Sequence, residues 1–246
     1  MPPQESKKGI FKKDMNLQFF RQERIPFQQT LIIKEFIKNS KPGNILEIGC
    51  STGEKTLKQL SHLGWNCLGI DINEKALKEA AKYAKVYLRR GNEPFAFIKN
   101  NSIDLVCAFD VFHHISDVEV TFHESLRCLK SSGIFLMIEH VEDSIFLRMG
   151  RNIFKKWEGM PILSRMYMKD WMNLFSKTPS VELLSVYTGS QYMELFGYLF
   201  YLFCKLTGVG NDLRAKYKNS LELKKHDFQH QDYSGAYAAL FVLKKI

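Results

Sequence analysis

The sequence lacks any apolar run long enough to cross a bilayer, which needs about twenty residues. The most apolar stretch, Leu195 to Cys204, has ten residues without a charge. The N-terminal residues contain no apolar signal core, and the five cysteines show no paired spacing of the kind that binds a metal. No internal repeat or low-complexity tract is present. These absences argue against membrane-spanning, secreted, metal-finger and repeat proteins, and we expect a cytoplasmic protein with reduced cysteines.

A strand followed by a glycine turn and a helix is the most informative feature that is present. Asn44 to Ile48 is apolar with one acidic residue, Gly49 and Gly53 bracket a turn, and the residues after Gly53 are polar at helical spacing. Such a turn lets backbone approach a ligand, and N–H groups at the helix start favour a negatively charged group. The alternative is a strand-to-helix corner with no ligand.

The glycine spacing distinguishes two nucleotide patterns. A G-x-G-x-x-G dinucleotide fingerprint would be met at only one of three positions, Gly49. The pattern [D/E]-x-G-x-G-x-G is met at Glu47, Gly49 and Gly53, with Ser51 in place of the middle glycine. This pattern resembles motif I of the class I S-adenosylmethionine-dependent methyltransferases, which implies S-adenosyl-L-methionine as the cofactor.

The following strands extend this resemblance. Asp71 ends the predicted strand Trp65 to Ile72, where a carboxylate can accept both ribose hydroxyls. Its alternative role is a helix N-cap, for which Asn73 is the more natural residue. After the predicted strand Val86 to Arg90, the family carries a residue pair near the adenine amino group. The resemblance implies these cofactor-binding residues: Glu47, Gly49, Cys50, Ser51, Gly53, Asp71, Ile72, Asn92, Glu93 and Phe109.

The stretch Asn101 to His114 resembles the family's fourth strand and its exit, S-F-D-L-V followed by L-H-H-I. Ser116 and Glu119 then predict a capping box for the next helix, and Ile134 to Ile138 a fifth strand. Strand and helix alternate five times, which is typical of a parallel sheet covered on both faces. We expect an α/β, doubly wound, mostly parallel seven-stranded sheet of the Rossmann-like methyltransferase fold, with the last strand antiparallel.

The remaining sequence predicts a cap and an insertion. Residues 1–42 form an N-terminal cap segment with a helix starting at Pro26, and residues 43–246 form the methyltransferase domain, with its cofactor-binding core at 43–140. A long insertion, residues 189–233, is the predicted substrate lid. Further predicted elements are a helix over Pro161 to Phe175 and strands over Val181 to Thr188 and Ala236 to Lys244.

The net charge of +9 lies outside the predicted cofactor core, because residues 41–140 hold twelve basic and twelve acidic residues. An anionic substrate, a nucleic acid, an anionic membrane or a merely solubilising surface would each explain it. The apolar segment Leu195 to Cys204 has three interpretations: a lipophilic substrate lid, an interfacial helix in peripheral membrane contact, or a buried cap or homodimer helix.

Three histidines at strand ends are the catalytic candidates. The methyl group of the cofactor is already activated, so the protein mainly aligns the acceptor, excludes water and removes a proton where needed. His113, His114 and His140 are placed for the base or for holding the acceptor, and the alternative is that they only fix the loop by hydrogen bonds.

The predicted function is methyl transfer to a small-molecule or lipid-like acceptor. Residues Ala108 to Phe112 lack the Asn/Asp-Pro-Pro-aromatic motif of many nucleic-acid N-methyltransferases, which disfavours a nucleic acid. The broad resemblance is to the type 11 group, which includes enzymes similar to those of quinone biosynthesis. The alternatives are an RNA methyltransferase that uses the basic flanks and a non-catalytic S-adenosylmethionine-binding protein.

Overall fold

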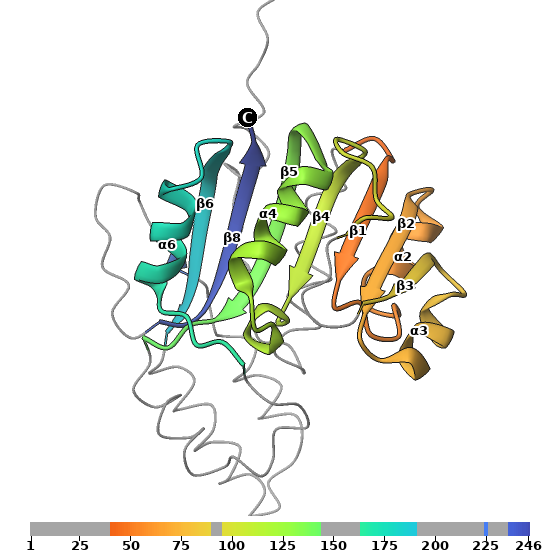
Figure 1. Ribbon diagram of the computed structural model, residues 1–246, viewed down its shortest axis with the longest axis horizontal. Coiled ribbons are helices and arrows are strands. Elements are labelled where there is room, and N and C mark those ends of the chain that lie inside the picture. The colour runs from red at the N-terminus through yellow and green to blue at the C-terminus, as the bar shows by residue number, and fades with distance from the viewer. Residues whose placement is uncertain (1–39, 90–94, 144–162, 191–223, 226–235) are drawn as a thin grey trace, which may run out of the picture.

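The computed structural model describes residues 40–89, 95–143, 163–190, 224–225 and 236–246. Its centre is one mixed sheet in the order β3-β2-β1-β4-β5-β8-β6-β7 (Figure 1). Seven strands are four or more residues long, and the edge strand β7 (Lys224–Lys225) has two. The seven-stranded, mostly parallel prediction is confirmed, and β7 is an addition that the sequence did not predict. The longer strands are β1 (Asn44–Ile48), β2 (Asn66–Asp71), β3 (Lys85–Leu88), β4 (Ile103–Phe109), β5 (Leu129–His140), β6 (Val181–Ser190) and β8 (Ala236–Lys245).

Helices cover both faces of this sheet, because its central strands are apolar on both sides. On one face, α4 (Val118–Cys128) and α6 (Met168–Ser176) pack on β1, β4, β5 and β8 around Phe122 and Trp171. On the other face, α2 (Leu57–His62) and α3 (Glu74–Ala80) pack on the odd-numbered residues of β1 and β4. Each apolar core is thus built from alternate residues of the same strands.

The parallel strands bring the ends of distant segments to one edge of the sheet. Strands β1, β2, β4 and β5 run in the same direction, so their carboxyl ends share this edge. Strand β8 pairs antiparallel with both β5 and β6, with His140 opposite Ala238 and Ser190 opposite Ala236. The connection between β6 and β8 therefore leaves and re-enters the sheet at the same edge, beside the end of β5.

Two local predictions are wrong. The N-cap of α4 is Asp117, whose Oδ1 accepts from Val120 N at 3.0 Å, so the helix is capped one residue after the predicted cap, Ser116. The helix predicted over Pro161 to Phe175 begins only at Met168. Residues 163–167 are non-helical, because the N–H groups of Leu163 and Ser164 donate to the His113 carbonyl oxygen.

Several predictions lie outside the described residues. They concern the helix at Pro26, the adenine contacts of Asn92 and Glu93, and the segment Leu195 to Cys204. Among the helices that the structure describes, none is long and apolar enough to cross a membrane. The four cysteines in the described ranges are buried free thiols.

Candidate active site

The loop after β1 adopts a left-handed backbone at every second residue. The φ angles are +71° at Gly49, +48° at Ser51 and +71° at Gly53. This alternation explains the G-x-G-x-G pattern physically, because only glycine adopts such angles without strain. Ser51 therefore takes a conformation that its own side chain disfavours.

The N–H groups of this loop are used within the protein. Gly49 N and Cys50 N both donate to the Ile70 carbonyl oxygen, at 2.8 and 3.1 Å, and Gly53 N donates to Cys50 O. Because α2 begins only at Leu57 and these N–H groups are already bonded, they do not form the expected anion site at a helix start. Cys50 is buried, and a Cβ on Gly69 would lie 2.7 Å from its Sγ, so its thiol belongs to the core.

Asp71 joins the first two loops at the sheet edge. Its Oδ2 accepts from Ser51 N and its Oδ1 from Asn73 N, both at 2.8 Å. The N-cap of α3 is Asn73, whose side chain accepts from Lys75 N and Ala76 N, so the capping role belongs to Asn73 and not to Asp71. Each oxygen of the half-buried Asp71 keeps a lone pair, and the neighbouring Ile72 is 58% exposed.

Glu47 is a buried acid beneath this loop. Its Oε2 has no hydrogen-bond partner among the described residues, and its side chain faces the core beside α2. Burial, assisted by the nearby Asp71 charge, raises the pKa of Glu47 to about 8. The carboxyl group is therefore mostly protonated at neutral pH, and a positive group bound nearby would favour its ionised form.

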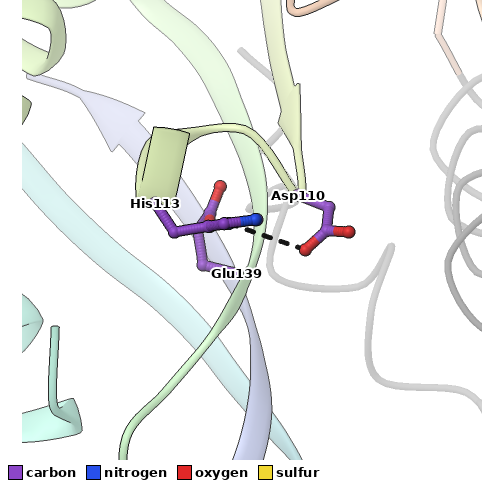
Figure 2. A group of neighbouring side chains, drawn as sticks. All are labelled: Asp110, His113 and Glu139. Carbon is purple, nitrogen blue, oxygen red and sulfur yellow. Dashed lines mark hydrogen bonds and ion pairs between the residues drawn. The ribbon is translucent and has the colours of Figure 1, made fainter. Parts of the chain in front are cut away.

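A second cluster lies at the ends of β4 and β5. Figure 2 shows Asp110 after β4, His113 on the short 3₁₀ helix η2 (Phe112–His114), and Glu139 near the end of β5. His113 Nδ1 lies 3.0 Å from Glu139 Oε2 and 3.7 Å from Asp110 Oδ1. His140 Nε2 lies 3.2 Å from the same Asp110 oxygen. The sheet thus brings two of the predicted histidines onto one carboxylate.

The backbone fixes this cluster. Glu139 is 1% exposed, and its Oε1 accepts from Val111 N at 2.8 Å and Phe112 N at 2.7 Å. Asp110 has φ +59°, and its N–H donates to Ile138 O at 2.7 Å. A non-glycine residue in this region carries strain, which is typical of functional sites.

The third predicted histidine lies beside the cluster. The ring of His114 lies 3.9 Å from that of His113, centroid to centroid. Phe109, predicted to bind the cofactor, is only 5% exposed and packs in the core. Sequence reasoning missed Asp110 and Glu139, although both stand at strand ends next to the predicted histidines.

Comparison with known proteins identifies the domain. The family described as "Methyltransferase domain", type 11, matches residues 46–137. The chain is 25% identical over 134 residues to "Uncharacterized methyltransferase YcgJ" of Bacillus subtilis, which covers 51% of this chain and 52% of YcgJ. The solved YcgJ structure superposes with a TM-score of 0.55 at 17% identity, over 88% of this chain and 97% of that one, and supports the fold.

Two further relatives have named reactions. The chain is 24% identical over 213 residues to a "Ubiquinone biosynthesis O-methyltransferase" of Pelagibacter ubique, over 80% of this chain and 84% of the relative. It is 26% identical over 129 residues to a "Sterol 24-C-methyltransferase" of Aspergillus fumigatus, over 46% of this chain and 33% of the relative. In sequence, the chain thus spans about half of the length of YcgJ, a third of the sterol enzyme and most of the ubiquinone enzyme.

Proposed function

We propose that this chain, which carries a class I S-adenosylmethionine-dependent methyltransferase domain of type 11, methylates an oxygen of a lipophilic small molecule. The observation that carries the proposal is the pair His140 and Asp110, with 3.2 Å between Nε2 and Oδ1. This pair lies at the sheet edge that also holds the glycine loop after β1. A cofactor loop and a basic side chain at one edge are what methyl transfer to a hydroxyl group requires.

The residues around the glycine loop fit S-adenosylmethionine. The loop Gly49–Gly53 would lie along the methionyl part, and the remaining lone pairs of Asp71 would accept from the ribose hydroxyls. Glu47 offers a buried oxygen without a partner among the described residues, which suits the positively charged end of this cofactor. When bound, S-adenosylmethionine supplies an activated methyl group. The cofactor residues predicted beyond these remain part of the proposal.

In this proposal His140 removes the proton of the acceptor hydroxyl. Its imidazole is 17% exposed, so a substrate can reach it, and the carboxylate of Asp110 stabilises the imidazolium that forms. His113 has its Nδ1 directed at Glu139 and is 10% exposed, which makes it less suited to this task. His140 is therefore the base, and His113 holds the loop with Glu139.

Two observations support the proposal that the acceptor is lipophilic. The proposed lid, residues 189–233, joins the end of β6 to the start of β8, and the pair Ser190 and Ala236 at these strand ends lies beside His140. The ubiquinone and sterol relatives have lipophilic molecules in their names. The ubiquinone relative also matches along most of its length and methylates oxygen, which favours a hydroxyl acceptor.

The test is transfer of a labelled methyl group from S-adenosylmethionine to lipid, small-molecule and RNA fractions of a cell extract. We expect label in the lipid or small-molecule fraction, and a loss of about 100-fold or more in His140→Gln. His62→Gln, an exposed histidine at the end of α2, is the matched control and should keep full activity.

Other outcomes would identify the alternatives. Label in RNA, with binding that weakens steeply as salt increases, would show a nucleic-acid methyltransferase. Tight binding of S-adenosylmethionine without labelling of any fraction would show a non-catalytic binding protein. Full activity of His140→Gln would remove His140 as the base.

A further inference from the structure

We propose that Asp110, His113 and Glu139 bind one first-row divalent cation, of the Mn²⁺ or Zn²⁺ type. The three residues come from the loop after β4, from η2 and from β5, and they converge on one point of the sheet edge (Figure 2). One ligand atom from each residue lies within 4.8 Å of the other two. Metal binding is independent of the proposed function, whereas its role in methyl transfer rests on that function.

The distances between the ligand atoms suit a cation. Two ligands about 2.1 Å from a metal lie roughly 3.0 Å apart at a right angle and about 3.4 Å apart at a tetrahedral angle. The recorded separations from His113 Nδ1 are 3.0 Å to Glu139 Oε2 and 3.7 Å to Asp110 Oδ1. Asp110 Oδ1 is the more distant of the two from His113, so Asp110, which stands on the loop between β4 and η2, must move inward for a cation to bind.

The ligands are held in place by their surroundings. Glu139 Oε1 accepts two backbone N–H groups, which leaves Oε2 directed at His113 Nδ1. Hydrogen bonds of this kind orient metal ligands and reduce the cost of ordering them. Asp110 is held by its own N–H bond to Ile138 O in a left-handed conformation. The site is thus largely preformed.

The charge of the cluster favours a cation. Glu139 is buried, and among the described residues no lysine or arginine pairs with it. His113 pairs with Glu139 as a cation only when it is protonated, and the second carboxylate of the cluster, Asp110, adds repulsion between the acids. A divalent cation between His113 Nδ1 and Glu139 Oε2 would neutralise both acids. It would replace the hydrogen bond that joins these two atoms, and the His113 proton would then be on Nε2.

The donor set indicates which cation. One imidazole nitrogen and two carboxylate oxygens suit Mn²⁺, Fe²⁺ or Zn²⁺, whereas Mg²⁺ and Ca²⁺ prefer oxygen ligands alone. Three protein ligands leave positions open for an acceptor hydroxyl, whose pKa the cation would lower. His140, on the other side of Asp110, would then take up the released proton.

The test is binding of Mn²⁺ and Zn²⁺ to the metal-free full chain. Binding is measured by equilibrium dialysis and, for Mn²⁺, also by electron paramagnetic resonance. We expect one equivalent to bind, with Mg²⁺ and Ca²⁺ weaker. Asp110→Asn and His113→Gln should weaken binding at least tenfold. The matched controls are the exposed residues of α4, Glu119→Gln and His123→Gln, which should bind like the wild type.

The outcomes separate this proposal from the proposed function. Absence of a stoichiometric Mn²⁺ or Zn²⁺ site, or equal affinity in folded Asp110→Asn and His113→Gln proteins, overturns the metal site. Stoichiometric cation binding that is lost in both variants supports it, even if no methyl transfer is found. Binding of S-adenosylmethionine, measured in the same variants, should stay near the wild-type value because the glycine loop is unchanged.

Discussion

Val111 packs directly over the α-carbon of Gly49. A Cβ placed on Gly49 would lie 2.4 Å from Val111 Cγ2, closer than real contacts allow. This contact joins the two halves of the candidate site, because Gly49 begins the loop after β1 and Val111 lies between Asp110 and His113. A side chain at Gly49 should therefore disturb the acid–histidine cluster as well as the glycine loop.

We expect Gly49→Ala to destabilise the protein by about 2 to 4 kcal/mol, from the overlap with Val111 and from the left-handed backbone. Gly64→Ala is the control, because φ is +84° there but the nearest atom, Pro42 Cγ, is 3.8 Å from the added Cβ. It should cost only about 1 kcal/mol. Denaturant unfolding measures the loss of stability in both alanine variants. A smaller loss for Gly49→Ala when Val111 is also replaced by Gly would confirm the contact.

Ser51 has a φ of +48°, where a β-branched side chain is strongly disfavoured. Ser51→Val should therefore lower the free energy of unfolding by roughly 1 to 2 kcal/mol, whereas Ser51→Gly should be neutral or slightly stabilising. Thermal melts of the two variants give the comparison. Equal melting temperatures for valine and glycine would contradict a left-handed residue at this position.

Asp71→Ala should weaken S-adenosylmethionine binding by roughly 1.5 to 3 kcal/mol, ten-fold or more, because it removes a charged acceptor pair. Asp71→Asn should lose less affinity than Asp71→Ala. Its NH₂ group must still face either Ser51 N or Asn73 N, both of which donate to Asp71. Titration calorimetry on folded protein is the measurement. Unchanged affinity in the alanine variant would leave Asp71 with only its structural bonds.

Glu47 should make stability depend on pH. Its pKa is near 4.5 when exposed and about 8 in the folded protein, so the folded state binds more protons between these values. The contribution of Glu47 to stability is complete below about pH 4.5 and falls as pH rises to 8. We therefore expect the free energy of unfolding of Glu47→Gln to rise relative to that of the wild type, by roughly 1 kcal/mol for each pH unit between 4.5 and 8.

Urea unfolding at pH 5, 6, 7 and 8 measures this difference. Glu182→Gln, an exposed change on β6, is the control and should run parallel to the wild type. A constant difference between Glu47→Gln and the wild type would show that Glu47 is ionised throughout.

The sheet and the glycine loop after β1 follow from local sequence. Short apolar runs separated by glycine turns and helical spacing predicted the strands β1 to β6 and β8, because strand and helix periods are local properties. The glycines at Gly49 and Gly53 likewise marked the left-handed turn, since backbone conformation limits the residue type at each position. The antiparallel last strand was predicted only through the family resemblance.

What needed the tertiary structure was pairing across the sheet. His113 and Glu139 are 26 residues apart, and only the parallel register of β4 and β5 brings their side chains to 3.0 Å. The bonds from Leu163 and Ser164 to His113 O replaced a predicted helical turn, because a contact between distant segments outweighed local propensity. Sequence by itself thus determined the strands and the glycine turn. The tertiary structure decided which acids and histidines meet, because burial and register act on residues that are far apart in the chain.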